Sequence, residues 1–225
     1  LNLVGDMGGG GLLLAFGIVC AVLEARSSGK GQIVDAAMVD GAAIQLSAVL
    51  MAHAMGVHTN PRGMNMGDSG SHFYEVYETS DGKFLAVGAI EPQFYAALCE
   101  GAELDPDVFG AQMDAQEWPT LKKRLAEVFK SRTRAEWTAI FDGTDACVSP
   151  VLALEEVSSH PHIKARGTYI DNDVLQPAPA PRFSRTPGAI AGPPPIPGQH
   201  SREVLESWGV APGDVDRLIE QGVIS

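Results

Sequence analysis

The segment Pro177–Pro197 constrains the fold more than any other part of the chain, because eight of its 21 residues are proline. Proline fixes φ and lacks the N–H group that helices and central strands require. We therefore expect this segment to be extended and to tether a small helical tail to the rest of the chain. Two short helices are expected in that tail, at Ser201–Trp208 and Pro212–Gln221.

Composition excludes several classes of protein. The chain has 225 residues, of which 45% are hydrophobic and 20% are charged, and its formal net charge is −12. This balance is typical of a globular chain with a core of its own and argues against disorder. A strongly acidic chain offers no basic surface to neutralise phosphates, so we expect no nucleic acid among its partners.

The cysteines indicate a reducing compartment. They are odd in number and widely spaced, which disfavours a disulfide framework or a structural zinc site: Cys20, Cys99 and Cys147. The C-terminal residues Gly222–Ser225 do not match the peroxisomal Ser-Lys-Leu signal, and the start of the chain lacks the basic region of a signal peptide. We expect a cytoplasmic location if the source is bacterial.

The N-terminal region is apolar and rich in glycine. Residues Gly8–Leu23 form a 16-residue stretch without a charge, bracketed by Asp6 and Glu24. Because a membrane span needs about 20 such residues, we expect a buried helix that ends near Arg26 and no membrane span. A short strand is expected at Gln32–Val34.

A second helix is expected after that strand. It should begin with Asp35 as its cap and run to Met55–Gly56. Apolar residues occur all round it, so it too is expected to be buried.

The middle of the chain has the pattern of an α+β unit. Asp81-Gly82 lies between the β-rich runs Phe73–Glu78 and Phe84–Gly88, which predicts a hairpin. Helices are expected after Pro92 and at Trp118–Lys130 and Thr133–Phe141, followed by a strand or extended piece at Cys147–Leu152 and a helical turn near Glu155–Val157.

Two carboxylates stand at expected helix starts. Asp6 precedes a run of glycines that matches neither the dinucleotide-binding pattern nor the Walker pattern. It is either a helix cap beside tightly packed glycines or a functional carboxylate at the positive end of a helix. Glu91 follows an apolar strand and precedes Pro92, and the same two interpretations apply to it.

The histidines and methionines leave less to infer. Only His72, just before the hairpin, lies near candidate chemistry, and His53 is expected to be a core residue. No histidine spacing suggests a metal site, so none is expected. The seven methionines fit either core packing or an acyl-binding surface.

Five sequence blocks point to a known family. In chain order they include Gly-Asp-Met-Gly-Gly-Gly, Ala-Ile-Glu-Pro-Gln-Phe-Tyr and Ala-Pro-Arg-Phe, and they occupy residues 5–10, 29–41, 86–95, 142–151 and 179–183. Together they resemble the α-methylacyl-CoA racemase branch of the family III CoA-transferases. The block containing Glu91 is the one that separates racemases from transferases in this resemblance.

The resemblance implies epimerisation of a 2-methyl-branched acyl-CoA thioester at its α-carbon, as part of branched-chain fatty acid metabolism. It assigns Asp6 as the catalytic group on one face and Glu91, paired with a histidine, on the other. It places Met7, Gly8 and Gly9 against the substrate. We further expect backbone N–H groups around Asp6–Gly8 to hold the enolate oxygen. CoA is part of the substrate, so no separate cofactor is expected.

The resemblance also implies an α/β fold, with part of a Rossmann-like large domain, a small α+β domain and an interlocked homodimer. It predicts residues 1–72 as large-domain core, 73–160 as the small domain, 161–199 as a Pro-rich return linker, and 200–225 as a helical tail on the large domain. Asp6 and Glu91 are then expected to meet across the dimer.

One departure from the family bears on activity. The catalytic histidine and most CoA contacts of the family lie upstream of the Gly-Asp block, whereas Asp6 is the sixth residue here. We therefore expect a racemase that lacks its N-terminal part and is slow or inactive alone. The alternatives are a CoA-transferase with Asp6 as the nucleophile and an inactive fragment.

Overall fold

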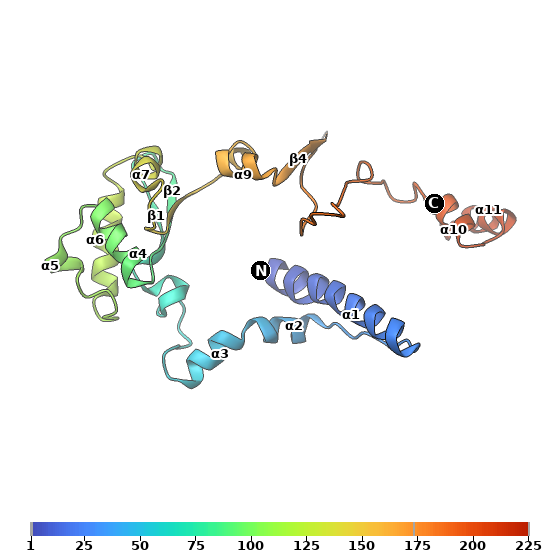
Figure 1. The fold of residues 1–225 in the computed structure, drawn as a ribbon, viewed down its shortest axis with the longest axis horizontal. Coiled ribbons are helices and arrows are strands. Elements are labelled where there is room, and N and C mark those ends of the chain that lie inside the picture. Colours follow the sequence, from blue (N-terminus) through green and yellow to red (C-terminus); the bar gives the residue numbers. More distant parts are fainter. Residues whose placement is uncertain (1, 173, 225) are drawn as a thin grey trace. The chain divides into compact units, whose positions relative to one another are not determined.

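The computed structural model describes residues 2–172 and 174–224, and the chain divides into two compact units, Leu1–Val151 and Leu152–Ser225. Figure 1 labels the helices and strands along the chain. The first unit contains η1 (Leu3–Leu12, π-helical), α1 (Leu13–Ser28), α2 (Met38–Gln45), α3 (Ser47–Ala54), η2 (Met66–Gly70), β1 (Tyr74–Glu78), β2 (Phe84–Gly88), α4 (Pro92–Gly101), α5 (Pro106–Phe109), α6 (Trp118–Phe129), α7 (Arg134–Phe141) and β3 (Val148–Val151). The domain boundaries expected from the sequence stay predictions.

A three-stranded antiparallel sheet with the order β1-β2-β3 organises the first unit. The predicted hairpin is confirmed, with Tyr74 opposite Gly88 and Glu78 opposite Phe84. Gly82 has φ +71° in the connecting turn, a conformation that glycine adopts without steric cost. The predicted third strand is confirmed as β3, which pairs with β2.

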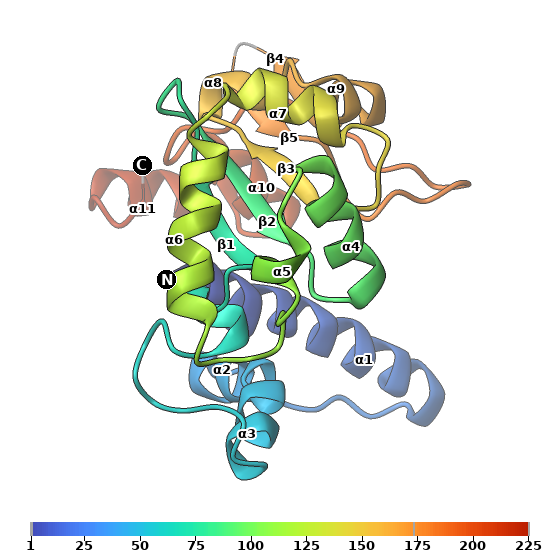
Figure 2. The same ribbon diagram turned by 90° about the vertical axis from the view of Figure 1, so that its left-hand side faces the viewer.

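The helices after the hairpin cover one face of this sheet, as Figure 2 shows for α4 and α6. All three predicted helices are confirmed, as α4, α6 and α7. Helix α6 places Leu121, Leu125 and Phe129 on one face at a spacing of four residues, and all three are buried. They meet Leu85 and Val87 of β2 in a single core cluster.

His72 lies inside this core. It is fully buried among aromatic rings, and its Nε2 lies 2.7 Å from the hydroxyl oxygen of Tyr95. Tyr95 donates its own hydroxyl proton to the carbonyl of Phe109 at 2.8 Å, so the imidazole donates from Nε2. Burial lowers the pKa of His72 to about 4, which keeps the ring neutral. His72 is therefore a structural residue of the core.

The first helix begins earlier than expected. Its π-helical start η1 begins at Leu3 with Asn2 as the cap residue, and it continues into α1 up to Ser28. Asp6 is therefore not a cap but an acidic residue in the first turn. The glycines after Asp6 do not interrupt the helix, because buried Gly9 and Gly10 pack against α2.

Burial of the N-terminal helices was predicted wrongly. Within the described residues neither α1 nor α3 buries any side chain. The close contact of this region is between η1 and α2, where a Cβ on Gly9 would lie 2.9 Å from the backbone nitrogen of Ala42. An all-round apolar helix needs partners on every side, and these two helices lack them in the described part of the chain.

The continuous helix Leu3–Ser28 is long and apolar enough to cross a membrane, and 11% of its most apolar window is buried. Core helices of water-soluble proteins can be equally long and apolar, so the length and hydropathy of this helix are weak evidence for a membrane span.

The strand expected at Gln32–Val34 is absent from the described structure, where residues 30–37 are irregular. A strand requires a hydrogen-bonding neighbour, and the described sheets offer none to this segment. The following helix also differs from expectation, since its cap residue is Ala37 rather than Asp35. A turn at Leu46 divides it into α2 and α3.

The second unit is built from short elements: α8 (Leu154–Val157), α9 (Pro161–Arg166), β4 (Tyr169–Asn172), β5 (Val174–Pro177), α10 (Ser201–Ser207) and α11 (Pro212–Glu220). The two C-terminal helices and the helical turn α8 are confirmed. The hairpin of β4 and β5 was not predicted. No helix or strand is described within residues 178–197, as the proline content predicts.

Candidate active site

Asp6 presents an exposed carboxylate in the first turn of η1. The N-terminal end of a helix carries partial positive charge, which stabilises a negative group there. The same end of the helix would also stabilise negative charge that develops on a substrate during a reaction.

The three residues after Asp6 differ in accessibility. Met7 is exposed, Gly8 is half-buried and Gly9 is buried. The amide of Gln45 lies over Gly8, 3.1 Å from where a Cβ would be, and its Nε2 donates to the carbonyl of Val4. Met7 is thus the most accessible of the three residues, whereas Gly9 is covered by α2.

The position at which η1 begins decides which backbone N–H groups are available to hold the enolate oxygen. Only the first few N–H groups of a helix lack acceptors within it. Because η1 begins at Leu3, Gly8 is its sixth residue, and the free donors are those of the turn that ends at Asp6. The roles of these residues toward the substrate stay predictions.

Glu91 occupies the cap position of α4, directly before Pro92. Its side chain is exposed and makes no capping hydrogen bond to the helix. The cap interpretation is therefore not supported by geometry, and the carboxylate is free to interact with another group. The helix below it is anchored by Tyr95, whose hydroxyl joins His72 and Phe109.

The structure does not join the two carboxylates. None of the hydrogen bonds and ion pairs recorded for the described residues links Asp6, in η1, with Glu91, at the start of α4. The expectation that they meet across a dimer stays a prediction.

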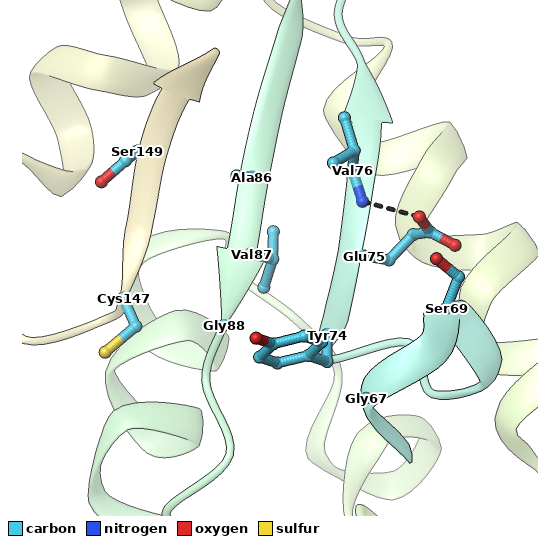
Figure 3. A pocket seen from close by; sticks show the side chains of 10 residues that line it. All are labelled: Gly67, Ser69, Tyr74, Glu75, Val76, Ala86, Val87, Gly88, Cys147 and Ser149. Carbon is cyan, nitrogen blue, oxygen red and sulfur yellow. Dashed lines mark hydrogen bonds between the residues drawn. The ribbon is translucent and has the colours of Figure 1, made fainter. Parts of the chain in front are cut away.

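An apolar groove lies on the sheet face that the helices leave uncovered (Figure 3). It has a volume of about 370 Å³, and its lining residues come from η2 and all three strands or their ends: Gly67, Ser69, Tyr74, Glu75, Val76, Ala86, Val87, Gly88, Cys147 and Ser149. This volume is within the range of small-molecule sites.

The side chains on this face are unusually apolar for solvent. Tyr74, Val76 and Phe84 are 41%, 50% and 44% exposed. An antiparallel sheet with one covered face normally carries polar residues on the other. The ring of Tyr74 lies toward Gly88, with its Cε2 3.8 Å from where a Cβ would be. This face is therefore suited to contact apolar groups.

One end of the groove lies close to Glu91. Gly88 and Cys147 line it there, and Gly88 donates its N–H to the Cys147 carbonyl at 2.9 Å. Burial and the charges of Glu91 and Asp145 raise the pKa of the Cys147 thiol. The Glu91 carboxylate thus lies near this end of the groove.

No metal centre is indicated among residues 2–172 and 174–224. No group of three histidine, cysteine or acidic side chains there is arranged to hold a metal ion.

Comparison with known proteins identifies the family. Residues 2–201 match the family described as "CoA-transferase family III". The chain belongs to the family III CoA-transferases. The resemblance seen in the sequence blocks is thereby confirmed.

Two curated relatives carry the same printed name, "Alpha-methylacyl-CoA racemase". The mouse protein is 46% identical and the human protein 44% identical over alignments covering 98% and 100% of this chain. The chain spans about 60% of the length of each.

A solved structure supports the fold. The "CAIB/BAIF family protein from Brucella suis" matches 88% of this chain and 54% of its own, with a TM-score of 0.65 and 22% identity. The family III CoA-transferase fold predicted from the sequence is thus confirmed.

Sequence reasoning missed the groove. Its apolar face was signalled by Tyr74, Val76 and Phe84, which share one face by register although the helices cover the other. Cys147 and the loop residues Gly67 and Ser69 gave no such signal, because only the fold brings them to this face.

Proposed function

We propose that the chain is part of an enzyme that interconverts the two configurations of 2-methylacyl-CoA thioesters. The observation that carries this proposal is the match to two racemases, at 46% and 44% identity along nearly the whole chain, which includes Asp6 and Glu91. Because the chain spans about 60% of those relatives, the proposal concerns the whole protein.

The chemistry is a proton transfer between two faces of one carbon. The thioester carbonyl acidifies the α-proton, and a base on one face removes it. The C–H electron pair moves to the carbonyl oxygen and gives an enolate. A protonated group on the opposite face then returns a proton to the carbon. The reaction needs one protonated and one unprotonated group at the same time.

In this proposal Asp6 acts on one face and Glu91, through its paired histidine, on the other. The exposed positions of both carboxylates support these roles. In the reverse direction the two faces exchange roles. CoA belongs to the substrate, and the reaction needs no separate cofactor.

The groove on the sheet is the proposed site of the acyl chain. Its apolar lining and its end at Gly88 and Cys147, close to Glu91, support this assignment. An α-carbon held at Glu91 directs its alkyl chain along the groove, where burial contributes about 0.8 kcal/mol for each methylene.

A homodimer and a cytoplasmic location in a bacterial source complete the proposal. In the dimer Asp6 of one subunit and Glu91 of the other face a single substrate.

The test is solvent exchange. Incubating 2-methyldecanoyl-CoA in D₂O with a protein of the relatives' full length should place deuterium at C2 without any acceptor acid. No exchange, together with transfer of CoA to added succinate, contradicts the racemase proposal. That outcome favours the CoA-transferase that the family description allows, with Asp6 as the nucleophile.

A further inference from the structure

We propose that Lys122 is a positioning residue that fixes one wall of the groove and thereby makes the site selective for long acyl chains. This inference rests on the proposed function, because it takes the groove as the acyl site. The wall is the segment Met66–Gly70, here called the strap.

The strap is held at its base by a small polar network. Asp68 accepts hydrogen bonds from the backbone N–H groups of Asn65 and Gly63, at 2.7 and 3.2 Å, and from Asn65 Nδ2 at 2.8 Å. Asn65 is buried and also joins Thr59 through both ends of its amide. This base is firm, so the position of the strap depends on how its other end is held.

The other end is held by Lys122. Its ammonium group donates to the carbonyl oxygen of Ser69 and forms an ion pair with Glu75 of β1. Glu75 also accepts from the N–H of Val76 at 2.8 Å, a bond drawn in Figure 3. One lysine therefore joins the strap to the edge strand of the sheet.

This ion pair is more than a loose surface contact. The Lys122 and Glu75 side chains are 33% and 15% exposed. Burial alone would raise the pKa of Glu75, but hydrogen bonds from Lys122, Val76 and Ser69 and the charge of Lys122 lower it. Partly buried pairs are screened less than exposed ones. Loss of Lys122 therefore loosens the strap, which keeps only the Ser69–Glu75 hydrogen bond to β1, and leaves the Glu75 carboxylate without its cation.

The location of the strap predicts which acyl chains are long enough to contact it. Gly67 and Ser69 of the strap lie beside β1, whereas Cys147 lies at the opposite border of the groove beside β3. Two strand spacings, about 10 Å, separate β3 from β1. An alkyl group of one or two carbons near Glu91 does not reach the strap, whereas a chain of eight carbons does. The bridge that Lys122 forms between Ser69 and Glu75 therefore affects affinity for long chains.

The test measures binding to the 225-residue chain by calorimetry with two probes, the pantetheine thioesters of 2-methylpropanoic and 2-methyldecanoic acid. The wild-type chain should bind the long probe at least about tenfold more tightly, because contact with a few additional methylenes suffices for that difference. Lys122→Met should reduce this ratio to about twofold by weakening the long probe alone. Lys122→Arg should retain most of the ratio, because the guanidinium keeps the positive charge beside Glu75 and has N–H donors for the Ser69 carbonyl.

A matched control lies on the same two elements. Lys130, at the end of α6, pairs with Glu78 of β1 at 2.8 Å and does not line the groove. Lys130→Met should leave the binding ratio of the two probes unchanged. Both methionine variants are also compared by thermal unfolding, which separates a loss of stability from a loss of selectivity.

A second variant changes the groove wall without altering Lys122 or Glu75. A Cβ added to Gly67 meets no atom within 4 Å and Gly67 lines the groove, so Gly67→Ala fits the fold and adds a methyl group to the groove wall. It should also weaken the long probe and spare the short one.

Three results overturn the inference: a wild-type chain without chain-length preference, a Lys122→Met variant that keeps the full ratio, or an equal loss in Lys130→Met. Deuterium exchange at C2 of 2-methyldecanoyl-CoA tests the proposed function separately. Exchange without an effect of Lys122 refutes only the positioning role. An effect of Lys122 without exchange supports the positioning role while the racemase proposal fails.

Discussion

The α+β body at residues 73–151 and the N-terminal helices at residues 3–54 are both rich in apolar side chains, but only the body buries them. In the body, Leu85, Leu125 and Phe129 have no exposed surface. In the N-terminal region, Leu12, Phe16 and Leu23 are largely exposed. A sequence pattern specifies which segments form helices, whereas burial depends on which other segments are present to cover them.

The largest expected effects concern one carboxylate in each region. In a protein of the relatives' length, Asp6→Asn and Glu91→Gln should each lower kcat by about 10²–10⁴-fold, the usual contribution of an acid–base group. Deuterium incorporation at C2 measures the rate. Asp40→Asn on α2 and Glu100→Gln on α4 are exposed controls that should retain activity. Wild-type rates in either site variant contradict the assignment.

The difference in burial between the regions predicts a difference in stability. In the 225-residue chain, Leu125→Ala should cost about 2–5 kcal/mol because it leaves a cavity in a closed core. Leu14→Ala, at a position 41% exposed, should cost less than about 0.5 kcal/mol. Urea unfolding followed by tryptophan fluorescence measures the first loss, and circular dichroism the second. Equal losses would show that the N-terminal helices are as closely packed as the body.

A pH effect should be specific to the body. The pKa of His72 is about 4 when folded and about 6.5 when exposed, so protonation favours the unfolded state. The contribution of His72 to the free energy of unfolding is constant above pH 6.5. As the pH is lowered from there toward 4, the free energy of unfolding falls by about 3 kcal/mol in total. Imidazole NMR resonances follow the titration directly. An ordinary midpoint near 6.5 in the folded chain contradicts the buried position.

The smallest expected effect tests the one close contact of the N-terminal region. A Cβ on Gly41 would collide with the carbonyl of Gly9, so Gly41→Ala should cost about 1–3 kcal/mol. Gly31→Ala is the control, because a Cβ there meets nothing within 4 Å. The helical signal at 222 nm during thermal unfolding compares the two variants. Similar curves for both would mean that η1 and α2 do not cross closely.

Local sequence signals predicted the body well because its elements form between neighbouring segments. Asp81-Gly82 predicted the hairpin of β1 and β2, and the helix expected at Trp118–Lys130 is α6. The absent strand at Gln32–Val34 shows the converse. A strand is stabilised by its neighbour, and a β-rich triplet does not reveal whether a neighbour exists.

The candidate site was predicted in part. Asp6 and Glu91 came from sequence blocks, and both are exposed and so accessible to a substrate. The groove was not predicted, because a wall made of Ser69, Tyr74 and Cys147 exists only after η2, β1 and β3 come together. The lysine that bridges Ser69 and Glu75 was also missed, since a single cation on an amphipathic helix resembles any solvated residue.

The hydroxyl of Tyr95 restrains helix α4, whose first residue follows Glu91. It binds His72 on one side and the Phe109 carbonyl on the other, one turn below Glu91 in the same helix. Helix α4 therefore does not rotate to adjust its carboxylate without breaking two buried hydrogen bonds. In the proposed reaction the thioester therefore has to reach a carboxylate whose backbone is held in place.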